Sequence, residues 1–312
     1  MSVEREVGAM HVASANTALP APPLVQPIKR SRRGPWRDAW RRLAANRAAM
    51  VGAIFVLVIC VAALFAPLIA PRGYEKQNYD ALRQTPNLTY WLGTDAAGRD
   101  MWARVIYGAR VSLTVGLVTQ VVALLLGVPL GLIAGYFGGW IDSLLMRVVD
   151  VLYAFPLILF ATLMMAWLRP GLSNVIVALS ITGWLVLCRL VRAQSMSLRS
   201  REFIEAARVV GVPTHRILLR HVLPNTASAI ITAVTFAVPQ AIFAEAALSF
   251  IGVGVNPPMP SWGQMVSDNI LYIRSAWHLA VFPALALGLT MLAFTTFGDG
   301  LRDAFDPRSA KG

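Results

Sequence analysis

Six apolar runs constrain the fold of this chain more than any other feature of its sequence. They cover residues 49–70, 111–136, 144–168, 175–194, 226–248 and 278–297. A helix of about 20 apolar residues is long enough to cross a hydrocarbon core of roughly 30 Å. Only 14% of the residues are charged, whereas soluble domains carry about a quarter. The sequence therefore predicts an all-α integral membrane protein with six transmembrane helices.

The basic residues predict how these helices are oriented. Lys and Arg gather before the first run, between the fourth and fifth runs, and after the sixth. Because cytoplasmic loops carry an excess of Lys and Arg, both termini are expected in the cytoplasm. The net charge of +12 is explained in this way, and we do not expect nucleic-acid binding.

The same pattern divides the chain into regions. Residues 1–35 are expected to form a disordered basic cytoplasmic tail, with Lys29, Arg30, Arg32 and Arg33 close to anionic lipid. Residues 36–308 form the transmembrane domain, and 309–312 a short C-terminal tail. The transmembrane domain contains outer segments 71–110 and 249–277 and a polar inner loop 195–225. In the first outer segment, Asp100 is expected to cap a short helix that lies in the membrane interface.

Two residue patterns predict how the helices pack and bend. Gly127, Gly131 and Gly135 stand four residues apart in the second run, and small residues at this spacing let another helix approach closely. Proline residues occur inside several runs and are expected to kink the helices there. They are Pro129, Pro156, Pro239 and Pro283.

The polar inner loop is the most distinctive part of the chain. Its sequence predicts a helix that begins at Arg201, capped by Ser200, and ends at Gly211 in a left-handed conformation. Helical spacing places Phe203, Ala207 and Val210 on one face and Glu205 with Arg208 on another. Pro213 should begin a second short helix that leads to Pro224. Periodicity alone fits either an ordinary interfacial helix or a docking helix for another protein.

No catalytic pattern accompanies these features. None of the lysines follows a glycine as the P-loop requires, and no nucleophile–base or metal-ligand spacing occurs. We therefore expect no enzymatic activity and no metal or cofactor in this chain.

Four ionisable residues in or near the apolar runs are candidates for a pathway or gate. They are Arg147, Asp150, Arg189 and Glu245. Charges at such depth usually face a cavity. The alternative is that a pair between Asp150 and an arginine holds the third and fourth spans together, and we favour this structural role. Glu245 could line the outer mouth or bind loop amides, and the sequence leaves both open.

The polar loop resembles a known family. The order Glu205-Ala206-Ala207, then Gly211, then Leu223-Pro224 is similar to the cytoplasmic coupling loop of permease subunits in ABC importers. Further stretches resemble the dipeptide/oligopeptide/nickel permeases, and specifically the second, C-type permease of dipeptide importers. These stretches are 92–95, 98–100, 135–140, 155–156, 220–225, 244–250, 260–263 and 298–303, and the likeness runs from about residue 36 to 308.

The resemblance implies a type I ABC importer permease in the bacterial inner membrane. Its partners would be a sister permease, two ATPase subunits that use ATP, and an extracytoplasmic substrate-binding protein. Glu205, Ala206, Ala207, Arg208 and Gly211, with Leu223 and Pro224, would couple the permease to an ATPase. Dipeptides or oligopeptides are the expected substrates, and nickel or another small solute is the alternative. An ion-coupled carrier that uses Asp150, or a purely structural membrane protein, would need no ATPase.

Overall fold

A computed structural model describes residues 35–305 of the chain. Almost all of the predicted N-terminal tail, including its basic cluster, and the predicted C-terminal tail lie outside the described residues. The described part forms one compact unit within Pro35–Gly312.

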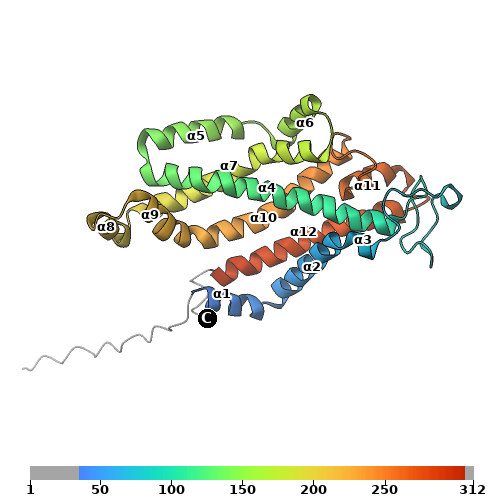
Figure 1. The fold of residues 1–312 in the computed structure, drawn as a ribbon, viewed down its shortest axis with the longest axis horizontal. Helices are drawn as coiled ribbons and strands as arrows, with labels where there is room; N and C mark the ends of the chain where they lie inside the picture. The colour runs from blue at the N-terminus through green and yellow to red at the C-terminus, as the bar shows by residue number, and fades with distance from the viewer. Residues whose placement is uncertain (1–34, 306–312) are drawn as a thin grey trace, which may run out of the picture. The chain divides into compact units, whose positions relative to one another are not determined.

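This part of the chain is built from helices (Figure 1). They are α1 (Pro35–Ala45), α2 (Arg47–Leu64), α3 (Ala66–Ile69), α4 (Met101–Phe137), α5 (Gly139–Tyr153), α6 (Leu157–Leu168), α7 (Leu172–Arg199), α8 (Glu202–Val209), α9 (Thr214–Ile217), α10 (Leu223–Phe250), α11 (Trp262–Asn269) and α12 (His278–Phe305). Short 3₁₀ turns occur at Tyr79–Ala81 and Ile270–Tyr272, and a π-helical turn at Leu218–Val222. Five helices within residues 35–305 are long and apolar enough to cross a membrane, and α5 with α6 makes a sixth span if the two are counted together. The expectation of six spans agrees with this arrangement.

The third predicted span is broken rather than continuous. Helices α5 and α6 meet at an angle of 79°, and Pro156 lies at the junction as the residue before α6. Proline disfavours helical conformation in the residue before it and has no N–H to donate. By contrast, α4 continues past Pro129 and α10 past Pro239.

Helix α4 begins earlier than the sequence predicts. The segment 101–110 is not a separate interfacial helix but the first three turns of α4, and Val105 and Ile106 are buried. Trp262 of α11 is fully buried and its indole N–H donates to the Val105 carbonyl at 3.0 Å. No proline separates these turns from the apolar run, and the helix continues through Gly108, which packs against Trp262. Asp100 caps α4 as predicted, because its carboxylate accepts the Trp102 N–H at 2.9 Å.

The three glycines of α4 form a packing face against α7, as predicted. A Cβ atom added at Gly127 would lie 2.8 Å from the Trp184 carbonyl oxygen, and one at Gly135 would lie 2.3 Å from the Arg192 carbonyl oxygen. Both distances are shorter than an ordinary van der Waals contact. The backbones of α4 and α7 can therefore approach this closely only because side chains are absent.

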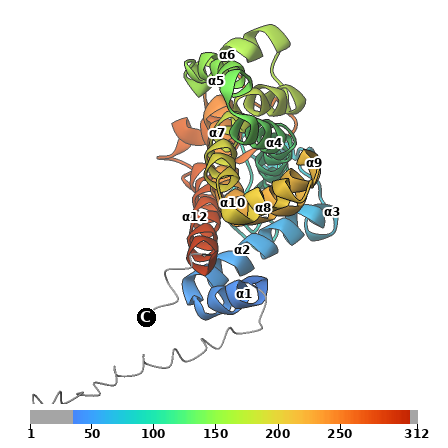
Figure 2. The ribbon, with the colours of Figure 1, turned by 90° about the vertical axis from the view of Figure 1, so that its left-hand side faces the viewer.

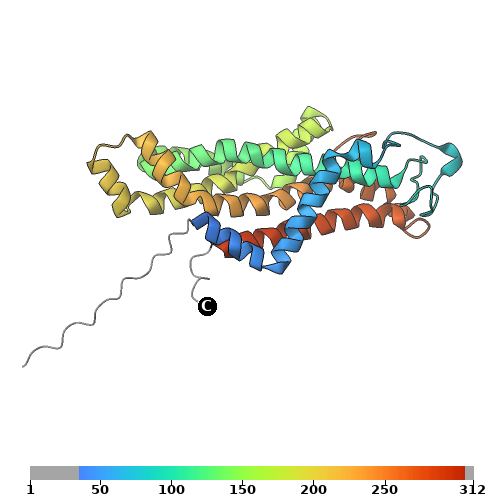
Figure 3. The same ribbon diagram turned by 60° about the horizontal axis from the view of Figure 1, so that its bottom comes forward.

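The two ends of the helix bundle differ in structure. At one end, called here the α8 end, α8 and α9 connect α7 to α10 (Figures 1 and 2). At the other, called the α11 end, α11 lies beside the long segment that joins α3 to α4 (Figure 1). Helix α1 packs on α12 through Ala39 and Leu43, and α2 crosses α12 obliquely (Figure 3).

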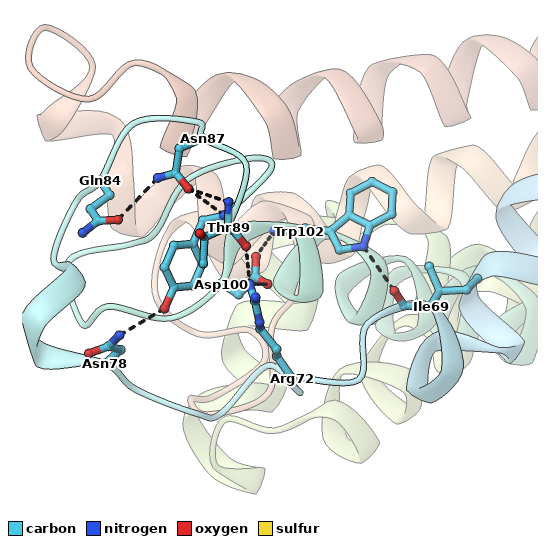
Figure 4. Close-up of polar contacts among 9 residues, drawn as sticks. Ile69, Arg72, Asn78, Gln84, Asn87, Thr89, Asp100 and Trp102 are labelled. Carbon is cyan, nitrogen blue, oxygen red and sulfur yellow. Dashed lines mark hydrogen bonds and ion pairs between the residues drawn. The ribbon is translucent and has the colours of Figure 1, made fainter.

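Polar contacts hold the segment between α3 and α4 in a fixed shape (Figure 4). Arg72 lies 3.7 Å from the Asp100 carboxylate and also donates to the Thr89 carbonyl. The Asn87 side chain accepts the N–H groups of Thr89 and Tyr90 at 2.9 and 2.8 Å. The segment thus forms an ordered cap on the α11 end rather than a loose loop.

Candidate functional site

Helix α8 is a short polar helix whose charges match its backbone dipole. Glu202 and Glu205 lie in its first turn and Arg208 in its last, and each sign of charge is favourable at that helix end. The residue that precedes the helix is Arg201, not Ser200, and it makes no side-chain cap bond. The prediction of a Ser200 cap is therefore wrong by one residue, since the α7 helix extends to Arg199 and Ser200 follows as its own C-cap.

The end of α8 is built around Gly211. Its φ angle is +82°, which is the left-handed conformation predicted from the sequence. The Gly211 N–H donates to the Arg208 carbonyl at 2.9 Å, and the Val212 N–H donates to the Ala207 carbonyl at 3.0 Å. These two bonds define a Schellman motif, and Val212 and Ala207 both pack against the same core cluster. The helix therefore has a fixed end and a fixed exit direction.

The buried stripe of α8 is centred on Ile204. Ile204 is fully buried in a cluster with Ile217 and Val222. Phe203 is 44% exposed and Val210 is 82% exposed, so neither belongs to the buried face. A helix of only eight residues buries a narrow stripe, and helix packing rather than periodicity selects which stripe that is.

Arg208 makes a contact with α4 that the sequence did not predict. Its Nε–H donates to the Tyr136 hydroxyl at 3.1 Å, and its guanidinium lies 5.1 Å from the centroid of that ring. Arg208 therefore joins α8 to the end of α4. The exposed residues of α8 are Glu202, Phe203, Glu205, Ala206, Arg208 and Val209.

The chain after α8 stays helical. A second helix begins directly after Pro213, as predicted. It does not end before Pro224, because α9 runs through the π-helical turn Leu218–Val222 directly into α10. Pro224 cannot donate to the carbonyl four residues before it and would crowd that carbonyl in a regular helix. The wider π turn immediately before it accommodates the proline. Leu223 and Pro224 thereby form the first turn of α10.

Two ion pairs join α5 to α7. The Asp150 carboxylate lies 2.6 Å from the Arg189 guanidinium, which also lies 4.1 Å from the centre of the Tyr153 ring. Asp142 pairs with Arg192, one turn farther along α7. The pairing of Asp150 with an arginine between the third and fourth spans is as predicted. Asp142 was not identified from the sequence, although it stands two helical turns before Asp150 and so faces the same helix. Arg147 is exposed on α5.

Glu245 lies in a buried cluster of hydroxyl groups. Its side chain is fully buried, and its two carboxylate oxygens accept hydrogen bonds from Ser112 at 3.1 Å and Ser249 at 2.7 Å. Ser249 in turn accepts the Val255 N–H at 3.2 Å, and Ser261 donates to its hydroxyl at 3.3 Å. Glu245 therefore ties α10 to α4 and to the loop before α11. It does not line a mouth, and the hydroxyl partners were not identified from the sequence.

The main cavity lies beside the α5–α6 junction. Its volume is about 610 Å³, and it is lined by parts of α4, α7 and α10 together with residues 152–157. Its polar lining comes from Thr119 and Gln120 of α4, Thr182 of α7, Gln240 of α10 and Tyr153 of α5. The cavity holds a few uncharged polar groups in an apolar wall, as is usual for sites that bind small molecules.

Comparison with known proteins identifies relatives of most of the chain. Residues 127–311 match the family described as binding-protein-dependent transport system inner membrane component. Residues 34–86 match the N-terminal transmembrane domain of oligopeptide transport permease C.

Individual relatives are similar along most of their length. The dipeptide transport system permease protein DppC of Bacillus subtilis is 43% identical over 282 residues, which are 90% of this chain and 88% of the relative. The glutathione transport system permease protein GsiD of Escherichia coli is 45% identical over 294 residues, which are 93% of this chain and 96% of the relative. Among solved structures, an inward-facing conformation of the MetNI methionine ABC transporter aligns with a TM-score of 0.55 at 18% identity. That alignment covers 66% of this chain and 97% of the matched chain, and it supports the fold.

Proposed function

The chain belongs to the family of inner membrane components of binding-protein-dependent transport systems, and from this premise we propose that it carries peptides across the inner membrane as the C-type permease of an ABC importer. The similarity to dipeptide and glutathione permeases over about 90% of the chain carries this proposal. Nickel and other small solutes remain substrates to be tested in competition.

The proposed assembly follows from the family. The permease works with ATPase subunits that bind and hydrolyse ATP and with an extracytoplasmic binding protein that delivers the substrate. A sister permease and two ATPase subunits complete the proposed complex. In this assembly the α8 end faces the cytoplasm, both termini lie on that side, and the α11 end faces the binding protein.

Helix α8 is the proposed contact with an ATPase subunit. Its stripe of Glu202, Glu205, Ala206 and Val209 is exposed, and Val209 is 87% exposed. Small and apolar residues let a helix sit in a groove of another protein, and Glu205 can form charge-assisted bonds of about 1.5–3 kcal/mol there. The Schellman turn at Gly211 and the Arg208–Tyr136 contact would transmit movement of α8 to α4 and α10.

The main cavity is the proposed inner part of the transport pathway. Movement of α8 would shift α7 and α10, which line this cavity, and so alternate its access between the two sides. The Asp150–Arg189 pair lies beside Tyr153 at the edge of the cavity, where it holds α5 on α7. Glu245 lies outside the cavity lining and is proposed to fix the loop before α11.

Uptake of a labelled dipeptide into proteoliposomes tests this function. The complete complex should accumulate alanyl-alanine only with ATP and the binding protein, and excess nickel should not compete. Accumulation driven by a proton gradient without ATP, and abolished by Asp150→Asn, would contradict the proposal and favour an ion-coupled carrier.

A further inference from the structure

A second, smaller cavity lies at the α11 end. Its volume is about 290 Å³. One wall is the stretch of α4 from Tyr107 to Thr114, and a second is Leu172 at the start of α7. Met259, Pro260 and Tyr74 line it from the two extramembrane segments. The cavity is therefore bounded both by spanning helices and by the ordered cap.

One cation and two aromatic rings dominate this cavity. Arg110 is exposed into it, and the rings of Tyr74 and Tyr107 lie 4.7 Å apart. Burial, and then a hydrogen bond with Glu75, raises the pKa of Tyr74, so its hydroxyl stays protonated at neutral pH. An arginine beside neutral tyrosines is a site for an anion attached to an apolar or aromatic group.

Arg110 has no counter-ion within residues 35–305. Three arginines near the α11 end do have one: Arg72 pairs with Asp100, and both Arg99 and Arg104 pair with Asp95. Arg110 differs from Arg274, which is also exposed and unpaired within the described residues, in that it lines a cavity. The guanidinium of Arg110 is thus left available for a carboxylate that the chain itself does not provide.

The smaller cavity and the main cavity follow one another along α4 and α7. The third shared element is α10, which lines the main cavity, while Met259 and Pro260 in the loop after it line the smaller one. Along α4 the lining passes from Tyr107–Thr114 of the small cavity to Thr119 and Gln120 of the main one, and along α7 from Leu172 to residues 179–187. An apolar layer separates the two cavities, formed by Val115, Met165, Val175, Leu179, Ala244 and Leu248. Leu179 and Ala244 of this layer also line the main cavity. This order is that of an outer vestibule, a closed apolar gate and an inner cavity.

We propose that Arg110, flanked by Tyr74 and Tyr107, is an outer subsite that receives the terminal carboxylate of a peptide before the apolar layer opens. This inference rests on the proposed peptide function and adds a residue that determines specificity. A lipid phosphate is the less favoured ligand, because Tyr74 and Met259–Pro260, which line the cavity, come from extramembrane segments.

Charge replacement at position 110 tests the subsite. Arg110→Cys is made in a chain that also carries Cys60→Ala and Cys188→Ala, and the complete complex is reconstituted in proteoliposomes. Uptake of alanyl-alanine is then measured against peptide concentration before and after treatment with a cationic or an anionic methanethiosulfonate reagent. The control is Arg274→Cys, an exposed arginine near the α11 end that does not line the cavity. The same chain with Arg110 intact, given the same treatment, controls for cysteines elsewhere in the complex.

The subsite predicts a particular pattern of results. Uptake at low peptide concentration should fall about tenfold in Arg110→Cys, as expected for loss of one charge-assisted contact, mainly through a higher KM. The cationic reagent should restore most of that loss and the anionic reagent should deepen it. Arg274→Cys should remain within about twofold of the parent chain under every treatment.

Other results would overturn the inference in distinguishable ways. Equal responses to both reagents, or unchanged uptake in Arg110→Cys, would exclude a carboxylate subsite while leaving peptide transport intact. An effect that follows the anionic lipid content of the liposomes instead of peptide concentration would assign Arg110 to a lipid phosphate. Failure of the Arg110-containing complex to take up any peptide would refute the proposed function itself.

Discussion

Adding one methyl group on the glycine face of α4 should separate α4 from α7. A Cβ at Gly131 would lie 2.6 Å from the Cys188 carbonyl oxygen and 2.8 Å from the Cβ of Val191. Favourable contacts between such atoms lie at about 3.5–4.0 Å. The first of these neighbours is a backbone atom inside α7, which cannot rotate away, so Gly131→Ala must push the two helices apart.

The size of the effect follows from two opposing contributions. Overpacking of a well-packed core costs about 1–3 kcal/mol, whereas alanine is better than glycine in a helix interior by about 1 kcal/mol. Gly288 in α12 is the matched control, since a Cβ there would meet nothing within 4 Å. The free energy of unfolding of Gly288→Ala should exceed that of Gly131→Ala by about 1–3 kcal/mol, because the helix-propensity gain is common to both.

Unfolding of the purified chain in mixed micelles, followed by circular dichroism as SDS increases, measures this difference. Both variants should insert and fold, with the midpoint lowered for Gly131→Ala and unchanged or raised for Gly288→Ala. Equal midpoints for the two variants would refute the close packing of α4 on α7.

Three further perturbations test other parts of the structure. Gly211→Val should reduce peptide uptake at least tenfold while leaving membrane insertion intact, because the left-handed φ of +82° costs a β-branched residue roughly 1–2 kcal/mol. The control is Gly73→Val, at a φ of +70° with equally open space, which should leave uptake unchanged. Ser249→Ala should lower the free energy of unfolding by about 1–3 kcal/mol, since the buried Glu245 side chain loses a hydrogen-bond donor. The control Ser143→Ala, at an exposed site, should change it by less than about 0.5 kcal/mol. Burial raises the pKa of Asp100, so the folded chain holds the carboxyl proton more tightly than the unfolded chain. The free energy of unfolding therefore falls as the pH rises from about 3.9 through the raised pKa of the folded state. Asp100→Asn, which still caps α4, should flatten that decline in an unfolding series from pH 4 to 7.

Features that depend on local sequence were predicted well. The length of apolar runs determines where spanning helices form, the Gly127–Gly131–Gly135 spacing determines a close-packing face, and Gly211 determines where α8 ends. In each case the physical cause lies within a few neighbouring residues, so periodicity and backbone preference are sufficient.

Features that depend on distant partners were not predicted. Arg208 turns toward Tyr136, 72 positions earlier in the chain, and Ser112 reaches Glu245 over 133 positions. No local pattern distinguishes a free arginine from one that reaches another helix. The 79° break at Pro156 and the π turn before Pro224 have a related cause. Proline indicates that a helix must adjust, but tertiary packing decides whether it breaks, widens or continues.

The central claim is that α8 docks on an ATPase. The most direct test is co-purification of the chain with the ATPase subunits that neighbouring genes encode. The wild-type chain and Glu75→Arg, which reverses an exposed charge at the α11 end, should both retain the ATPase in detergent. Glu205→Arg, which reverses an exposed charge on α8, should lose it while the chain stays folded and inserted. Retention of the ATPase by Glu205→Arg at the wild-type level would contradict the docking of α8.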